Sequence, residues 1–80
     1  MGYHTKKITK GNFGEFSKIK EEIEELLDAH KQGNSVMELI EISNLLGAIE
    51  EYLKRFNMTL DDILKMTKAT REAFEEGERK

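Results

Sequence analysis

Residues 15–56 read EFSKIKEEIEELLDAHKQGNSVMELIEISNLLGAIEEYLKRF, and the stretch contains no proline. In its first half, apolar residues recur with the 3.6-residue period of an α-helix. The apolar stripe is formed by Phe16, Ile19, Ile23, Leu26, Leu27 and His30. We therefore expect a first helix over about residues 15–31, with Phe16 packed in the core.

A second helix is expected in the other half of this stretch. Gly33 ends the first helix, and Asn34 or Ser35 is a suitable N-cap for a helix that runs to about Phe56. The apolar arc of this helix spans about 140°, which is wider than packing against one neighbouring helix requires. It consists of Leu39, Ile42, Leu45, Leu46, Ile49, Tyr52, Leu53 and Phe56. The pattern predicts an antiparallel hairpin whose second helix also contacts a partner chain.

A third helix is expected to run to about Glu76, where Gly77 ends it. Asn57 is a suitable C-cap for the second helix, and Thr59 followed by Asp62 fits a capping box. The inner stripe of the third helix is Leu60, Ile63, Leu64, Thr67, Thr70 and Phe74. The predicted fold is thus all-α, a helical hairpin plus a third helix, assembled as an oligomeric helical bundle.

The chain has the size of one small domain. We divide its 80 residues into a basic N-terminal arm (1–14), a helical core (15–76) and a charged tail (77–80). A chain of this length buries only about 60–65% of its extended surface, so a partner subunit is expected to add stability. The absence of cysteine excludes disulfides, thiolate zinc sites and cysteine nucleophiles. Without a membrane-length apolar run or a signal-peptide pattern, a cytoplasmic protein with no membrane partner is expected.

The net charge of −3 is unevenly distributed. The first twenty residues contain five lysines and a single glutamate, which gives +4 and leaves −7 for the remainder. Such a basic arm could bind an anionic ligand, a nucleic acid or the acidic surface of another subunit, or it could be a solvated tail.

Two pairs of oxygen-bearing side chains occur at a spacing of three residues, Glu22 with Glu25 and Glu41 with Asn44. Residues at i and i+3 share a helix face, so two such pairs on antiparallel helices could hold a hard cation. On the helical wheel Glu22 borders the apolar stripe, Glu25 stands beside it and Glu21 points largely outward. The alternative interpretation is that these are ordinary solvated helix faces.

Residues 18–26, KIKEEIEEL, followed by EISN at 41–44, resemble the signature of the MazG-like all-α nucleoside triphosphate pyrophosphohydrolases. That signature is Glu-Glu-x-x-Glu followed by Glu-x-x-Asp. The resemblance implies that magnesium is bound by Glu22, Glu25, Glu41 and Asn44, with manganese as an alternative. It also implies hydrolysis of a nucleoside triphosphate to the monophosphate and pyrophosphate by a homodimer or homotetramer.

Further roles follow if this site is active. Glu21 or Glu22 would orient or deprotonate the attacking water, and Lys18, Lys68 and Arg71 are the candidates for substrate contact. The two histidines, His4 and His30, have no mutual ligand spacing, and His30 is expected at the edge of the core.

One position departs from the family pattern, because Asn44 stands where the last ligand is aspartate. Asparagine still offers a carbonyl oxygen but removes a negative charge, for which Glu38 could compensate. The substitution favours an alternative function, a catalytically weak or inactive module for nucleotide sensing or subunit association. Nucleic-acid binding ranks third, because it depends on the basic arm alone and the acidic body argues against it.

Overall fold

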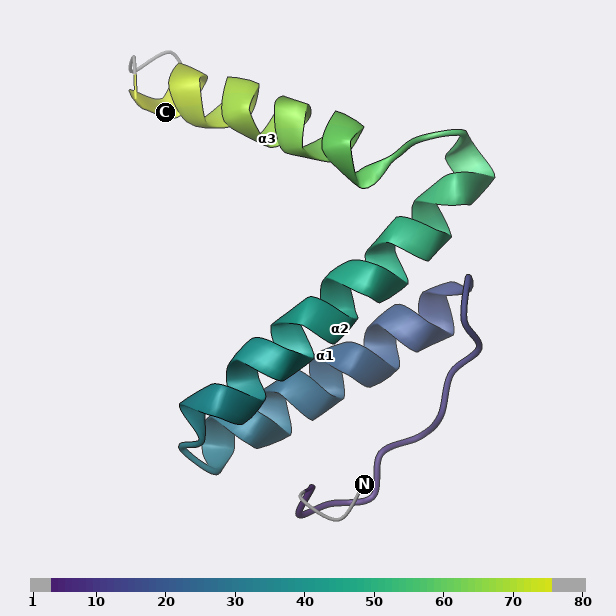
Figure 1. Ribbon diagram of the computed structural model, residues 1–80, viewed down its shortest axis with the longest axis vertical. Coiled ribbons are helices and arrows are strands. Elements are labelled where there is room, and N and C mark those ends of the chain that lie inside the picture. The colour runs from purple at the N-terminus through teal and green to yellow at the C-terminus, as the bar shows by residue number, and fades with distance from the viewer. Residues whose placement is uncertain (1–3, 76–80) are drawn as a thin grey trace.

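The structure is a computed structural model that describes residues 4–75, and within this range it is all-helical, with no strand. Helix α1 spans Phe16–Lys31, α2 spans Ser35–Leu53, a 3₁₀ turn η1 covers Lys54–Phe56, and α3 spans Leu60–Glu75. α1 and α2 lie side by side and antiparallel, and α3 follows at the far end of α2 (Figure 1). The all-α prediction is confirmed. The predicted helix end at Glu76 and the tail at 77–80 lie outside the described residues.

The helix boundaries have the local causes expected from the sequence. The side chain of Asn34 caps α2 by accepting a 3.1 Å hydrogen bond from the Met37 N–H. Gly33 precedes it with a φ of 70°, in the left-handed region that glycine adopts without strain. At the start of α3, Thr59 N–H donates to the Asp62 carboxylate at 2.9 Å, and Asp62 N–H donates to the Thr59 hydroxyl at 3.1 Å. This pair is a capping box.

α1 does not pack through the middle of its apolar stripe. Its buried residues are Ile19, Glu21, Glu22, Asp28 and Ala29. By contrast Phe16 is 62% exposed and forms a T-shaped ring contact with Tyr52, at 5.9 Å between centroids. The prediction that Phe16 lies in the core is therefore wrong for the single chain. The helix is rotated so that its acidic border, rather than the apolar centre, faces the rest of the molecule.

In α2, as in α1, the predicted apolar side is not the buried side. Its buried residues are Met37, Glu41 and Ala48, whereas four members of the predicted apolar arc are exposed: Leu39, Ile42, Leu46 and, in η1, Phe56. The contact face carries small residues, and Ala29 and Ala48 are 0% and 2% exposed. Because alanine lets two helices approach closely, this side can pack tightly around the glutamates. The hairpin thus has an acidic interior and an apolar outer face.

The N-terminal arm, residues 4–14, runs back alongside α1 toward the loop between α1 and α2 (Figure 1). Thr5 N–H donates to the Asp28 carboxylate at 3.0 Å, and Gly11 N–H donates to the Glu21 carboxylate at 2.8 Å. The arm thus lies against acidic residues of its own chain, a placement that was not among the alternatives drawn from the sequence. Gly11 is required for this approach, since a Cβ there would lie 2.3 Å from the carbonyl oxygen of Ser17.

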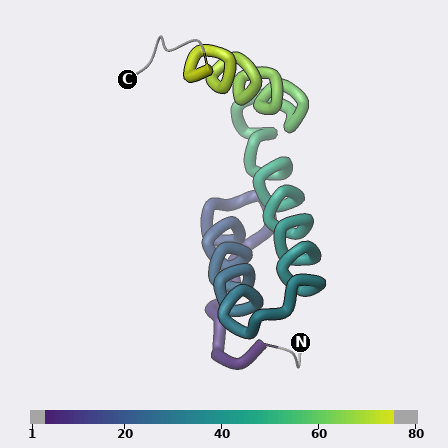
Figure 2. The backbone as a smooth tube through the Cα atoms, turned by 90° about the vertical axis from the view of Figure 1, so that its left-hand side faces the viewer, coloured from purple at the N-terminus to yellow at the C-terminus, as the bar shows by residue number. Residues whose placement is uncertain are grey.

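α3 is set apart from the hairpin. Among the described helices it packs only against α2, and Figure 2 shows it at the end of the molecule remote from the α1–α2 loop. Residues 4–75 contain no helix with the combined length and apolarity required to cross a membrane.

Substitution of Gly11 should detach the arm. We expect Gly11→Ala to accelerate amide hydrogen exchange of Thr5 by at least about tenfold, because the added methyl group collides with the α1 backbone. NMR-detected exchange measures this directly. Gly47→Ala is the matched control, since a Cβ at Gly47 has nothing within 4 Å, and it should leave the exchange of Thr5 unchanged. Equal exchange in both variants would contradict the close docking of the arm.

Candidate metal centre

The fold brings glutamates from both hairpin helices together with a histidine from the arm. One oxygen or nitrogen from each of His4, Glu25 and Glu41 lies within 4.8 Å of the others, and the same holds for Glu21, Glu22 and Glu25. The two groups share Glu25 and form one continuous acidic cluster, which consists of these four glutamates and His4. Of the predicted cation ligands, Glu25 lies close both to Glu22 and to Glu41.

The cluster is largely shielded from water. Glu41 is 0% exposed, and Glu21 and Glu22 are 3% and 5% exposed. Among the described residues, the Oε1 atom of Glu22 is buried and has no hydrogen-bond partner. A buried carboxylate oxygen without a partner carries a desolvation penalty, which Lys18 offsets only at the other oxygen of the same group. This atom is the clearest sign that the cluster is incomplete.

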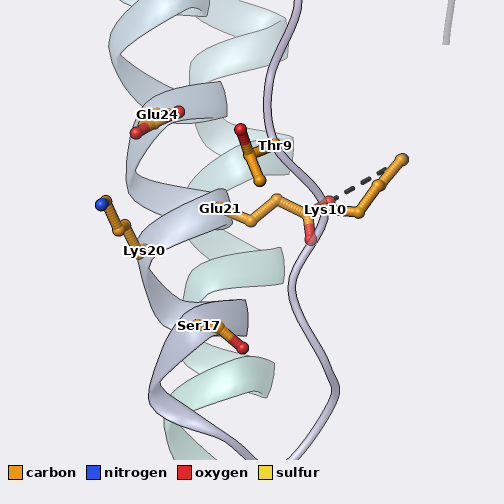
Figure 3. Close-up of a pocket in the computed structure, with 6 residues that line it drawn as sticks. All are labelled: Thr9, Lys10, Ser17, Lys20, Glu21 and Glu24. Carbon is orange, nitrogen blue, oxygen red and sulfur yellow. Dashed lines mark ion pairs between the residues drawn. The ribbon is translucent and has the colours of Figure 1, made fainter.

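Two lysines neutralise one end of the cluster. The ammonium of Lys18 lies 3.2 Å from Glu21 Oε1 and 3.1 Å from Glu22 Oε2. Lys10 on the arm reaches Glu21 Oε2 at 3.8 Å, and Figure 3 shows Glu21 extended from α1 toward the arm to meet it. Partial burial acts in the opposite direction, but the Gly11 N–H and Lys18 hold the pKa of Glu21 below its usual value.

The prediction that Glu21 points largely outward is wrong. Its wheel position is indeed far from α2, but the arm covers that side of α1 and buries the carboxylate. The sequence pattern of α1 alone carries no signal for this covering segment.

At the other end of the cluster, His4 is the basic side chain that contacts Glu25 and Glu41. Burial raises the pKa of Glu25 to about 7, and the neighbouring charges of Glu22 and Glu41 add to the effect. Close carboxylates cannot all ionise in a shielded site, so one of them retains a proton. A cation placed between Glu22, Glu25 and Glu41 would remove the repulsion that produces this shift.

Sequence reasoning missed His4 and Asp28. His4 Nδ1 lies 2.8 Å from Asp28 Oδ2, and His4 Nε2 lies 3.2 Å from Glu41 Oε2. Thr5 also binds Asp28 through its N–H and its hydroxyl, and these hydrogen bonds lower the pKa of the aspartate. No local spacing could reveal the group, because His4 precedes its two partners by 24 and 37 residues.

The remaining predicted residues lie at different distances from the cluster. Asn44 is exposed at its edge, and its side-chain amide donates to Glu41 Oε1 at 3.3 Å. Lys18 is inside but already paired with carboxylates. Lys68 and Arg71 are exposed on α3, which does not pack against α1, so one chain does not bring them to the site.

Glu38 is also separate from the cluster. It binds His30 at 3.1 Å, and both residues line an apolar groove with Leu26, Leu27, Ile23 and Ile42. The interpretation of Glu38 as a substitute for a missing ligand is therefore not supported by its position. His30 is exposed and borders this groove, not the cluster.

The donor set fits a divalent cation that prefers oxygen. Three glutamates converge from two helices, one carboxylate oxygen is without a partner, and the mutual repulsion of the group is strong. A small cavity of about 140 Å³, lined by His4, Lys6, Ile8, Lys10 and Glu25, adjoins the end that contains Glu25. Such a cavity provides a route from solvent to Glu25.

Comparisons of the chain with protein families, with curated proteins and with solved structures find no match.

The raised pKa of Glu25 predicts a pH-dependent stability in cation-free protein. A folded pKa near 7, above the usual 4.5, means that the stabilising contribution is complete below about pH 4.5 and is lost as the pH rises through 7. Glu25→Gln stays neutral and should raise the free energy of unfolding at pH 8, on the order of 3 kcal/mol, with no gain at pH 4.5.

Urea unfolding in EDTA between pH 4.5 and 8 measures this difference. Glu24→Gln is the control, since it removes the same charge at the adjacent position and lies outside the cluster. Stability curves of Glu25→Gln and wild type that run parallel over the whole pH range would show that Glu25 is not strained by its neighbours.

Proposed function

We propose that this protein is a magnesium-dependent nucleoside triphosphate pyrophosphohydrolase that converts a nucleoside triphosphate to the monophosphate and pyrophosphate. The observation that carries the proposal is the buried, under-neutralised cluster of Glu22, Glu25 and Glu41, in which Glu22 Oε1 has no partner within the described residues. The resemblance of residues 18–26 and 41–44 to the MazG-like signature supplies the reaction, since those positions are the ones that converge.

The proposed roles follow from the environment of each side chain. Glu22, Glu25 and Glu41 would hold the cation, with Asn44 contributing its carbonyl oxygen from the edge. A bound divalent cation supplies charge neutralisation for the phosphate oxygens and acidifies a water molecule. Lys18 pairs with both Glu21 and Glu22, but both oxygens of Glu21 are engaged, by the Gly11 N–H and by Lys10, whereas Glu22 Oε1 has no hydrogen-bond partner among the described residues; Glu22 is therefore the better candidate for the water-positioning base.

Fewer of the predicted substrate-binding residues than of the predicted cation ligands lie at the cluster. Lys18 is the one predicted phosphate contact that lies at the cluster, and releasing it from Glu21 and Glu22 requires a competing cation there. Lys68 and Arg71 would meet a triphosphate only if α3 of one chain approached the cluster of another. An assembly of chains is therefore part of the proposal.

Asn44 provides the sharpest test of the catalytic proposal. Asn44→Asp adds a fourth carboxylate at the edge of the cluster and should tighten magnesium binding by about tenfold, or about 1.4 kcal/mol. Pyrophosphate release from a panel of nucleoside triphosphates should increase with it, whereas Glu41→Gln should abolish both. Calorimetry and a pyrophosphate assay give the two readouts.

The matched control is Ser43→Asp, which adds the same charge to the exposed neighbouring position on α2. It should change neither quantity by more than about twofold. If calorimetry detects no magnesium binding in wild type or in Asn44→Asp, the acidic cluster is not a metal centre and the proposed reaction fails.

A second candidate function, subunit association without catalysis, is favoured by the outer face of the hairpin. Ile23 and Leu27 of α1 and Ile42 and Leu46 of α2 are all 41–49% exposed. The apolar groove of about 380 Å³ lies between these helices. Contiguous exposed apolar surface of this kind typically marks an interface.

We therefore expect a dimer or tetramer by analytical ultracentrifugation at micromolar concentration. Leu46→Lys should shift the protein toward the monomer, because a charged ammonium would be buried in the interface. Ser43→Lys, which introduces the same charge at an exposed polar position, should leave the assembly intact. A monomeric wild type would contradict both the proposed assembly and the proposed role of this face as an interface.

A further inference from the structure

We propose that His4, carried by the N-terminal arm, is a direct ligand of the divalent cation held by Glu25 and Glu41, and that it biases the site toward cations that accept nitrogen, Mn²⁺ before Mg²⁺. This inference rests on the cation site of the proposed function. Neither the i, i+3 spacing nor the resemblance to the MazG-like signature includes His4, because the arm lies outside the motifs at residues 18–26 and 41–44.

The geometry places the imidazole nitrogen at the cluster. His4 Nε2 is 3.2 Å from Glu41 Oε2 and 3.9 Å from Glu25 Oε1. Two ligands at adjacent corners of an octahedron, each about 2.1 Å from the cation, are about 3 Å apart. Small movements of these side chains would therefore bring all three atoms into a first coordination sphere. The His4 side chain is 9% exposed, so it is shielded with the cluster.

Asp28 prepares His4 for this role. Its Oδ2 atom lies 2.8 Å from Nδ1, and the two Thr5 hydrogen bonds and Gln32 hold the carboxylate in place. A carboxylate that accepts the Nδ1–H leaves the lone pair of a neutral imidazole on Nε2, the atom that faces the glutamates. This arrangement, in which a carboxylate orients a histidine toward a metal, is the usual surrounding of a metal-binding imidazole.

A second observation points to a ligand at the same place. The Oε1 atom of Glu22 is buried without a partner, and Glu22 lies against Glu25. The proposal is thus not based on acidic residues alone. It combines an oriented imidazole, an orphaned carboxylate oxygen and the cavity that adjoins Glu25.

The donor set predicts the choice of cation. Mg²⁺ is bound almost entirely through oxygen, whereas Mn²⁺ and the later divalent metals accept imidazole nitrogen as well. Removal of the imidazole should therefore weaken Mn²⁺ binding more than Mg²⁺ binding. Because the basic arm delivers the nitrogen, cation preference would depend on a segment outside the hairpin.

Pulsed electron paramagnetic resonance of the Mn²⁺-loaded full chain tests the proposal. A directly coordinated imidazole modulates the electron spin echo through its ¹⁴N nucleus. The chain contains two histidines, His4 and His30, so two variants assign the signal completely. His4→Gln should lose the ¹⁴N modulation. His30→Gln, the matched control at the exposed contact with Glu38, should retain it.

Calorimetry with MnCl₂ and MgCl₂ separates this inference from the function on which it rests. We expect His4→Gln to weaken Mn²⁺ binding at least about tenfold and Mg²⁺ binding by less than about threefold, with an unchanged helical circular dichroism spectrum. If both cations bind but the wild type lacks ¹⁴N modulation, or His4→Gln retains it, the cluster binds metal through carboxylates alone and the inference fails. If neither cation binds, the proposed function fails as well.

Discussion

Glu22, Glu25 and Glu41 are held close together in a shielded space, and their mutual repulsion is the constraint on which the rest of the structure depends. A helical hairpin of this size gains most of its stability from buried apolar residues. Here the interface between α1 and α2 instead contains more carboxylates than cationic side chains. Burying carboxylates in excess of cations lowers the free energy of unfolding unless an ion is bound. Lys18 relieves only part of the cost, at the end occupied by Glu21.

The same constraint explains why apolar residues face outward. α1 and α2 each bury an alanine, Ala29 and Ala48, whose small side chains are compatible with a close approach of the two helices. Both apolar arcs are thereby displaced from the centre of the hairpin, and Leu46 and Ile23 remain substantially exposed. The orientation of α1 and α2 about their own axes thus accounts both for the carboxylates inside the hairpin and for the apolar residues on its outer face. In an assembly, the larger part of the apolar core would form between chains.

The sequence predicts the helices of this fold more reliably than it predicts their packing. The α1–α2 connection at Gly33 and Asn34 and the capping box of Thr59 were foreseeable, because each depends on residues a few positions apart. The rotation of the helices was not foreseeable from the apolar period, since the period locates an apolar stripe but does not say whether a helix of the same chain covers it. The i, i+3 spacing found three glutamates of the cluster, Glu22, Glu25 and Glu41, but not Glu21. It could not find His4, whose position depends on how an irregular segment returns along α1.

The route of the arm also sets an order of events in folding. α1 and α2 are joined by residues 32–34 alone, so their contacts close a short loop at little entropic cost and should form early. The contacts of the arm instead join residues that are far apart in the sequence, since His4 lies 24 positions from Asp28 and 37 positions from Glu41. The arm is synthesised before its partners on α2, so it docks onto a hairpin that already exists. Under the proposed coordination by His4, the complete ligand set would therefore form only in the fully folded chain, after the hairpin has already brought the glutamates together.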